Sequence, residues 1–299
     1  MPFKYISFLA GLAAVLAQDA ASTCNNYVII STRGTFEHQG PSIGFKDMIA
    51  WTLGNVTGGV EYDTVYPAAQ NQTFYLGTDD VVRYIDAGVQ SCPDQRYLLL
   101  GYSQGASVTD AALYNYTDPE SAGYKAIAAV LLIGNPYKIP DKVNDVDQLG
   151  GSSNRQLRGS LYNTSLPVGY GNGIPEVFYT SNKLIDICYE NDPVCAPQSA
   201  HANLTAHILY GGSLAVQNMG TRFLVSKLGG ATTNSTNGTS PTTSASGSSG
   251  SSIPVSTSTP SSTSSTTVPT GPASGLAVAV QMPALWTTIG LALVSAFLA

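Results

Sequence analysis

Short apolar runs alternate with longer mixed segments between residues 24 and 230. The runs that have the length and composition of buried strands cover residues 27–30, 60–66, 96–102, 127–134 and 176–179. The segments whose apolar residues recur at helical spacing are 43–53, 78–90, 104–114 and 213–228. Strands that are apolar along their whole length are buried on both faces. The pattern therefore predicts a three-layer α/β/α fold with a central five-stranded parallel sheet, and function at the carboxyl ends of its strands.

Charge narrows the function classes. The 299-residue chain has a formal net charge of −6, and no Asp, Glu, Lys or Arg follows Lys227. The absence of a basic cluster excludes a nucleic-acid binder that relies on phosphate neutralisation. The four cysteines do not have zinc-ligand spacing, and no other motif implies a metal or an organic cofactor, so we expect neither.

The amino-terminal segment resembles a secretory signal. Lys4 supplies a positive start, residues 6–16 are apolar, and small residues near Ala17 suit cleavage. Cleavage after Ala20 or Ala21 is an alternative. The apolar run is shorter than the about 20 residues of a membrane-spanning helix. We expect a signal peptide over residues 1–17 and a folded domain over residues 18–230.

The composition of the carboxyl-terminal part is not that of a segment that forms a hydrophobic core. Residues 231–272 are rich in Ser, Thr and Pro, which predicts a disordered, O-glycosylated stalk. Residues 273–299 end in an uncharged apolar tail, the pattern of a GPI-anchor signal, with Ser274 or Gly271 as the attachment site. An ordinary tail anchor usually carries Lys or Arg on its cytoplasmic side. We therefore expect a cell-surface protein that contacts the membrane through a GPI lipid only, or is transferred to the cell wall.

N-glycosylation sequons are frequent along the chain and agree with a secretory route. The candidate asparagines are Asn55, Asn71, Asn115, Asn163, Asn203, Asn234 and Asn237.

A candidate nucleophile lies between an apolar run and a helix of small residues. Gly101, Ser103 and Gly105 form the motif G-x-S-x-G at this point. A tight strand-to-helix turn holds such a serine in a strained conformation with its hydroxyl exposed for attack. The alternative for Ser103 is a helix-capping serine.

A nucleophilic serine needs a base and an orienting acid. The order Ser, acid, His in α/β-hydrolases excludes His38 and leaves His201 and His207. The acid is expected after the last strand, and the candidates there are Asp186, Glu190 and Asp192.

Three motifs occur in one order: G-Y-S-Q-G at 101–105, C-x3-D-P-V-C at 188–195 and H-x-x-Y at 207–210. Together they resemble the fungal cutinase and acetylxylan esterase family, over roughly residues 24–228. The resemblance implies a cutinase-like α/β-hydrolase fold with Ser103 as nucleophile, Asp192 as acid and His207 as base. His207 follows Asp192 at a slightly longer gap than is usual in the family, so His201 stays the rival base.

The same resemblance implies an oxyanion hole and two disulfides. Arg33-Gly34-Thr35 resembles the R-G-[ST] segment of the family, so Thr35 and the backbone N–H of Gln104 would stabilise the oxyanion. A simple turn residue is the alternative for Thr35. Four cysteines allow three pairings, of which the family pattern implies Cys24–Cys92 and Cys188–Cys195.

The resemblance implies a monomeric enzyme that hydrolyses carboxylic esters: cutin, or short and medium acyl esters. A first alternative is an acetylxylan esterase that deacetylates plant polysaccharide, which the turn Gly134-Asn135-Pro136 favours slightly. A second is a non-catalytic, GPI-anchored surface mannoprotein on a hydrolase scaffold.

Overall fold

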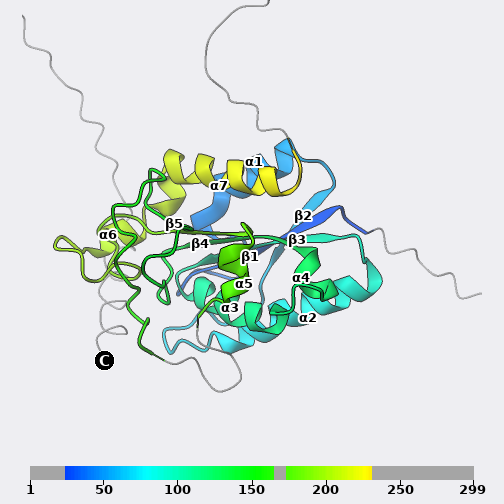
Figure 1. Cartoon of the computed structure of the whole chain (residues 1–299), viewed down its shortest axis with the longest axis horizontal. Coiled ribbons are helices and arrows are strands. Elements are labelled where there is room, and N and C mark those ends of the chain that lie inside the picture. The colour runs from blue at the N-terminus through cyan, green and yellow to red at the C-terminus, as the bar shows by residue number, and fades with distance from the viewer. Residues whose placement is uncertain (1–23, 165–172, 231–299) are drawn as a thin grey trace, which may run out of the picture. The chain divides into compact units, whose positions relative to one another are not determined.

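The computed structural model describes residues 24–164 and 173–230. In this part of the chain a parallel sheet has the strand order β2-β1-β3-β4-β6-β5 (Figure 1). The strands are β1 (Tyr27–Thr32), β2 (Gly59–Asp63), β3 (Arg96–Tyr102), β4 (Ile127–Ile133), β5 (Asp145–Val146) and β6 (Leu184–Ile187). The order places β3, which precedes the candidate nucleophile, inside the sheet.

Helices cover both faces of the sheet. They are α1 (Lys46–Asn55), α2 (Tyr75–Ser91), α3 (Gln104–Leu113), α4 (Ala122–Ala126), α5 (Glu176–Thr180), α6 (Leu204–His207) and α7 (Leu214–Lys227). Three 3₁₀ turns accompany them: η1 (Ile43–Phe45), η2 (Tyr114–Tyr116) and η3 (Tyr210–Gly212). Helices α1 and α7 lie on one face, and α2 to α5 lie on the other (Figure 1). The three-layer fold predicted from the sequence is confirmed.

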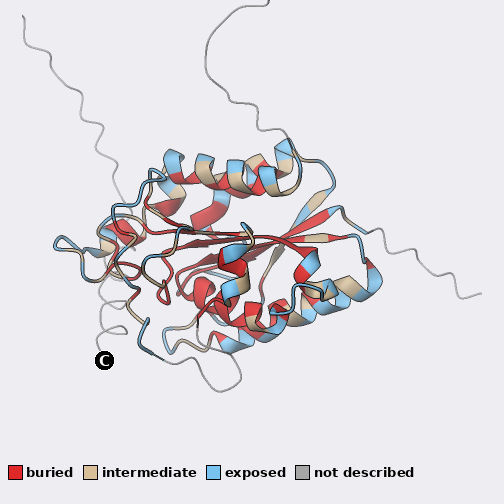
Figure 2. Cartoon of the chain, viewed as in Figure 1, coloured by how far each residue is buried: buried red, intermediate tan, exposed pale blue. Residues whose placement is uncertain are grey.

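The core follows the two-residue alternation of strand side chains. In β1, Tyr27 and Ile29 pack with α1 and α7, whereas Val28 and Ile30 pack with α2 and α3. Every residue of β1 is buried, and red ribbon runs through the centre of the body in Figure 2. This explains why the central strands are apolar along their whole length.

Two predictions about the sheet are wrong. Residues 176–179 form most of helix α5 rather than a fifth strand, because Pro175 at the N-cap and Glu176 in the first turn favour a helix start. The sheet has six strands, since β6 and the two-residue β5 extend it beyond β4. In β6 the residue Asp186 interrupts the apolar run, which hid this strand in the sequence.

Two disulfides are formed: Cys24–Cys92, which spans 68 residues, and Cys188–Cys195, which spans 7. The first lies at the amino ends of the strands. The end of α7 lies at the same edge, because the guanidinium of Arg96, the first residue of β3, donates to the carbonyl of Lys227. Both ends of the described body therefore lie near the amino ends of the strands, opposite their carboxyl ends.

The described sequon asparagines are all exposed: Asn55, Asn71, Asn115, Asn163 and Asn203. Asn234, Asn237, Gly271 and Ser274 lie outside the described residues, as do the predicted signal peptide, stalk and anchor signal. Among the described helices none is both long and apolar enough to span a bilayer.

Candidate active site

The strand-to-helix turn between β3 and α3 holds Ser103. Its backbone is at φ 55°, ψ −118°, a conformation that L-residues rarely adopt. A Cβ on Gly101 would lie 2.6 Å from the carbonyl oxygen of Gly105, and a Cβ on Gly105 would overlap the carbonyl of Thr32. The two motif glycines therefore permit a turn this tight. Ser103 itself donates its backbone N–H to the carbonyl of Ile133 at 3.0 Å, which ties the turn to β4.

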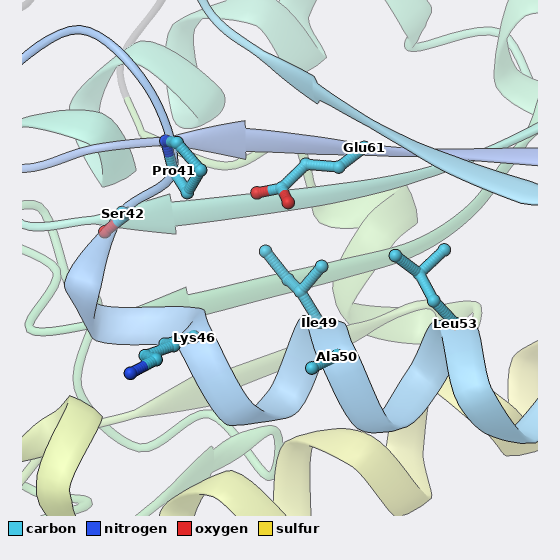
Figure 3. A pocket seen from close by; sticks show the side chains of 7 residues that line it. All are labelled: Pro41, Ser42, Lys46, Ile49, Ala50, Leu53 and Glu61. Carbon is cyan, nitrogen blue, oxygen red and sulfur yellow. The ribbon is translucent and has the colours of Figure 1, made fainter.

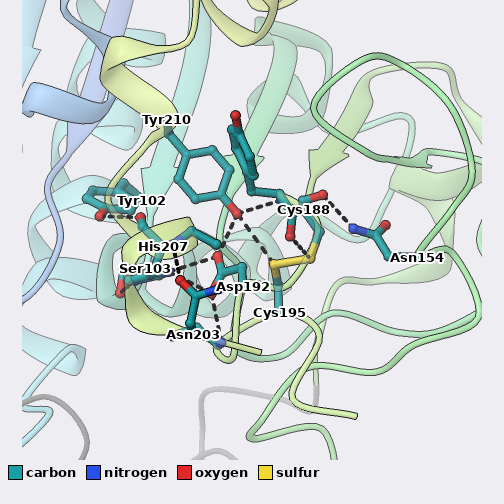
Figure 4. Close-up of polar contacts among 12 residues, drawn as sticks. Tyr102, Ser103, Asn154, Cys188, Asp192, Cys195, Asn203, His207 and Tyr210 are labelled. Carbon is teal, nitrogen blue, oxygen red and sulfur yellow. Dashed lines mark hydrogen bonds and ion pairs between the residues drawn. A yellow bond between two sulfur atoms is a disulfide. The ribbon is translucent and has the colours of Figure 1, made fainter. Parts of the chain in front are cut away.

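Ser103, His207 and Asp192 form one hydrogen-bonded chain (Figure 4). The Nε2 atom of His207 is 2.8 Å from Oγ of Ser103. The Nδ1 atom of His207 is 2.8 Å from Oδ2 and 3.0 Å from Oδ1 of Asp192. All three residues are at most 2% exposed. The arrangement places an imidazole where it can take the serine proton while a carboxylate fixes its orientation.

The other candidates for base and acid lie elsewhere. His201 is exposed on the loop before α6, where its carbonyl accepts from Asn203. Glu190 is exposed and accepts from Gln148. Asp186 lies within β6 and accepts from Nδ2 of Asn135 at 2.9 Å. His207 and Asp192 are thus the imidazole and carboxylate that reach Ser103.

The acid is fixed by several donors. Inside the ring closed by Cys188–Cys195, the carboxylate of Asp192 accepts the backbone N–H of Val194 at 2.8 Å. It also accepts the hydroxyl of Tyr210 at 2.6 Å. Burial raises the pKa of Tyr210 well above its usual range, and the charge of Asp192 adds to this, so the phenol stays protonated and remains a donor. The sequence motif H-x-x-Y contained this tyrosine without revealing its partner.

The base occupies a space that only glycine leaves open. Gly134 follows β4 with φ 59°, and a Cβ there would lie 2.7 Å from Cε1 of His207 and 3.1 Å from Oδ2 of Asp192. The glycine of the Gly134-Asn135-Pro136 turn is therefore explained by the room that the imidazole and the carboxylate need.

The two predicted oxyanion-hole residues belong to two segments that adjoin Ser103. Thr35 lies in the turn after β1, and Gln104 directly follows Ser103 in the chain. A Cβ on Gly34 would be 3.3 Å from Cβ of Ser103, so the turn that carries Thr35 packs directly against the serine. The Oγ1 atom of Thr35 accepts from Nε2 of Gln72 at 3.3 Å. Gln104 begins α3, where backbone N–H groups have no acceptor within the helix. The segments that carry Thr35 and Gln104 therefore both adjoin Ser103, and their role as an oxyanion hole stays a prediction.

Hydrogen bonds of Glu37 and Arg33 hold the turn that carries Thr35. The carboxylate of Glu37 accepts the backbone N–H of Gly34, the N–H of Ile43 at 2.8 Å and the hydroxyl of Ser42 at 3.0 Å. Arg33 donates to the carbonyl of Glu37 at 2.8 Å. Burial raises the pKa of Glu37, whereas these hydrogen bonds and Arg33 oppose the rise. No role for Glu37 could be predicted from the sequence, because the donors to its carboxylate are brought together only in the folded turn.

A separate hollow of about 250 Å³ lies between α1 and β2 (Figure 3). Its lining residues are Pro41, Ser42, Lys46, Ile49, Ala50, Leu53 and Glu61. Burial raises the pKa of Glu61 to about 7, and the nearby charge of Asp63 adds to the rise. None of the five predicted catalytic or oxyanion residues lines this hollow. Within residues 24–164 and 173–230, no cluster of three or more His, Cys, Asp or Glu side chains has a metal-binding arrangement.

Comparison with known proteins assigns the family. The sequence profile of the cutinase family, described as "Cutinase", matches residues 23–228. The chain belongs to the cutinase family. Family membership and the shared fold make it an enzyme of the esterase class.

Relatives of this cutinase-family chain occur in bacteria as well as fungi. Carboxylesterase Culp1 of Mycobacterium tuberculosis is 30% identical over 197 residues, which cover 64% of this chain and 76% of the relative. A protein named cutinase from Hypocrea jecorina is 34% identical over 122 residues, covering 38% of this chain and 47% of the relative.

Solved structures share the fold. A cutinase-like protein from Cryptococcus sp. is 37% identical, with a TM-score of 0.61, and the match covers 70% of this chain and 98% of that chain. The catalytic core of an acetyl xylan esterase from Trichoderma reesei is 21% identical with a TM-score of 0.53, covering 68% and 99% of the two chains. The second likeness concerns the fold alone.

Proposed function

We propose that this cutinase-family protein is a secreted serine esterase that hydrolyses carboxylic esters through an acyl-enzyme, with Ser103, His207 and Asp192 as its triad. The observation that carries the proposal is the continuous hydrogen-bonded chain in which Nε2 of His207 lies 2.8 Å from Oγ of Ser103 and Nδ1 lies 2.8 Å from Asp192. A base and an orienting acid in this geometry activate a serine hydroxyl.

The first half-reaction forms the acyl-enzyme. Oγ of Ser103 attacks the ester carbonyl carbon while its proton passes to Nε2 of His207. The carbonyl oxygen gains negative charge, which the hydroxyl of Thr35 and the backbone N–H of Gln104 stabilise. Each such preset donor contributes about 3 kcal/mol to transition-state binding in related reactions. The carbon–oxygen ester bond then breaks, and His207 returns its proton to the leaving alcohol.

The second half-reaction reverses these roles. Water gives a proton to His207 and attacks the acyl carbon, and the tetrahedral intermediate is held by the same two donors. Its collapse breaks the bond to Oγ, and His207 returns the proton to Ser103. The carboxylic acid leaves and the enzyme is restored. Throughout, Asp192 keeps Nδ1 of His207 protonated and stabilises the imidazolium.

For the substrate we propose cutin or short and medium acyl esters. The 37% identity to a cutinase-like protein supports this choice over an acetylxylan esterase, to which only the fold is similar. The Gly134-Asn135-Pro136 turn does not favour the second activity, because Gly134 makes room for His207 and Asn135 binds Asp186. Rates on p-nitrophenyl acetate, butyrate and longer esters, and on acetylated xylan, distinguish the two.

We also propose that the enzyme is located outside the cell, where a glycosylated stalk and a GPI anchor attach it to the membrane. Two disulfides and the exposed position of the five described sequons agree with an oxidising secretory route.

The decisive test is Ser103→Ala, with Ser107→Ala as the matched control from the next turn of α3. We expect Ser103→Ala to lose fluorophosphonate labelling and to lower kcat for p-nitrophenyl butyrate by about 10³-fold or more. Ser107→Ala should keep both labelling and activity within a few fold. Equal labelling of the wild type and Ser103→Ala, or no labelling of either, would instead support the non-catalytic scaffold.

A further inference from the structure

The second tyrosine of the sequence motifs lies where it can act on the acid of the proposed triad. Tyr210 begins η3, three residues after His207, and is fully buried. Its hydroxyl is 2.6 Å from Oδ2 of Asp192, the same oxygen that lies 2.8 Å from Nδ1 of His207 (Figure 4). One carboxylate oxygen is therefore shared between the base and this phenol.

The direction of the Tyr210 hydrogen bond follows from its other partner. The backbone N–H of Tyr189 donates to the phenol oxygen at 2.9 Å. Because a phenol has a single proton and the N–H already uses the oxygen as acceptor, that proton points to Asp192. Burial and the neighbouring carboxylate keep the phenol neutral, as its raised pKa indicates.

Tyr210 also joins two parts of the site that are separate in the sequence. Tyr189 and Asp192 both belong to the ring closed by Cys188–Cys195, and Sγ of Cys195 is 3.4 Å from the phenol oxygen. Tyr210 belongs instead to the segment that carries His207. Its backbone carbonyl accepts from Nε2 of Gln217 at 2.9 Å, which anchors this segment to α7.

We infer that Tyr210 is a positioning residue for the esterase reaction, which holds Asp192 in the orientation and charge distribution that His207 requires. The inference rests on the proposed function. A hydrogen bond to a charged acceptor is stronger than a neutral one, and here it disperses part of the carboxylate charge. Without the phenol proton, Asp192 binds a protonated imidazole more tightly and loses one of the donors that fix its orientation.

The groups that face Tyr210 determine what a pH profile would report. From the acid loop these are Asp192 and Tyr189, whose backbone N–H donates to Tyr210 and whose ring centroid is 5.8 Å away. From α6 it is His207, and from β3 it is Tyr102, whose ring centroid is 5.9 Å away. Tyr102 also loses its proton only far above neutral pH because it is buried.

The test is Tyr210→Phe, which removes only the hydroxyl. We expect kcat/KM for p-nitrophenyl butyrate to fall about tenfold at its plateau, mainly through kcat, since the orientation of the acid matters most in the transition state. The acid limb of the kcat/KM profile should move up by about half a unit to one unit, because the imidazolium persists to higher pH.

Tyr102→Phe is the matched control. The hydroxyl of Tyr102 donates at 2.8 Å to the carbonyl of His207, a neutral acceptor. This variant should lower stability or activity without moving the acid limb. Thermal unfolding of both variants shows whether each one folds.

A Tyr210→Phe enzyme that folds and keeps both its plateau and its acid limb would overturn the inference, as would equal shifts in the two variants. Ser103→Ala, assayed in parallel, keeps the outcomes apart. If Ser103→Ala is inactive while Tyr210→Phe is unchanged, the triad holds and only the role of Tyr210 fails. If Ser103→Ala is active, the proposed function itself fails.

Discussion

Gly134 is a residue at which a side chain would displace His207 and Asp192 directly. It combines a left-handed backbone conformation with contact distances that leave no room for a methyl group beside His207 and Asp192. Gly229 has a similar positive φ of 78°, but a Cβ there would meet nothing within 4 Å. Comparing Gly134 with Gly229 therefore separates the cost of backbone strain from the cost of displacing the side chains of the proposed triad.

We predict that Gly134→Ala lowers kcat/KM by about 100-fold or more, because a displacement of the imidazole by a fraction of an ångström breaks its alignment with Ser103. Gly229→Ala should lose about 1 kcal/mol of stability from the positive φ and keep its activity. Ester hydrolysis and thermal unfolding measure the two effects. Equal activity of Gly134→Ala and wild type would show that the turn can move aside.

At the scale of elements, the two disulfides have different positions relative to the site. Cys24–Cys92 ties the chain before β1 to the end of α2, away from the triad. Cys188–Cys195 closes the small ring that holds Asp192. Loop-entropy arguments give about 4 kcal/mol for the longer loop and about 2 kcal/mol for the shorter one.

We therefore expect the double variant Cys24→Ala/Cys92→Ala to lose more unfolding free energy and to keep kcat near the wild-type value. The variant Cys188→Ala/Cys195→Ala should lose less stability but at least tenfold in kcat, because the orientation of Asp192 depends on the ring. Urea unfolding and steady-state kinetics measure both. The reverse ranking of the kcat values would contradict this assignment.

The strands β1 to β4 and the longer helices were predictable from the sequence, whereas β5, β6 and the short helices α4, α5 and α6 were not. The runs at 27–30, 96–102 and 127–134 are central strands, because burial on both faces requires apolar residues throughout. Strand β6 was missed because Asp186 breaks its apolar pattern. The free-energy cost of burying Asp186 is partly offset by a hydrogen bond from Asn135, which is distant in sequence. Residues 176–179 have strand-like composition, but the preceding proline starts a helix there.

The residues of the candidate site also differ in how far the sequence predicts them. Ser103 and its glycines form a local turn whose requirements are readable in a few residues. Asp192 and His207 needed the family resemblance, because residues alone left Asp186, Glu190 and His201 open. The partners of Tyr210 and Glu37 are brought together only by tertiary packing, so no local spacing predicts them.

At the scale of the whole molecule, buried carboxyl groups influence how stability depends on pH. Burial raises the pKa of Asp186 to about 6 and that of Asp145 to about 8, and the charge of Asp186 adds to the rise at Asp145. Burial also raises the pKa of Asp110 well above its usual range. Lys138, itself buried, lies 3.3 Å from Asp145 and partly offsets these effects.

A carboxyl group whose pKa is higher in the folded than in the unfolded state favours folding while it is protonated. Its contribution is complete below about pH 4, the unfolded value, and is lost as the pH rises through the folded value. For Asp186 and Asp145 that loss extends over about pH 4 to 8. The two residues therefore make the protein less stable toward alkaline pH.

We predict that Asp186→Asn reduces the loss of unfolding free energy between pH 5 and pH 9 by about 1–1.5 kcal/mol, because about half of the full contribution is already lost at pH 5. The amide oxygen can still accept from Asn135, so the variant removes the titration and keeps the hydrogen bond. Urea unfolding at pH 5, 7 and 9 provides the comparison. Parallel pH curves for the variant and the wild type would show that Asp186 does not cause the dependence.

The ends of the described body and the proposed nucleophile lie at opposite ends of the strands. The chain enters near Cys24 and leaves near Gly230 at the amino edge, whereas Ser103 lies at the far end of β3, about 20 Å away for a strand of seven residues. Coupling the enzyme to a bead or a film through either end would therefore leave its reactive edge turned toward the solution. Such an immobilised enzyme should work on a bulky polymer as well as on a small ester, without a long spacer.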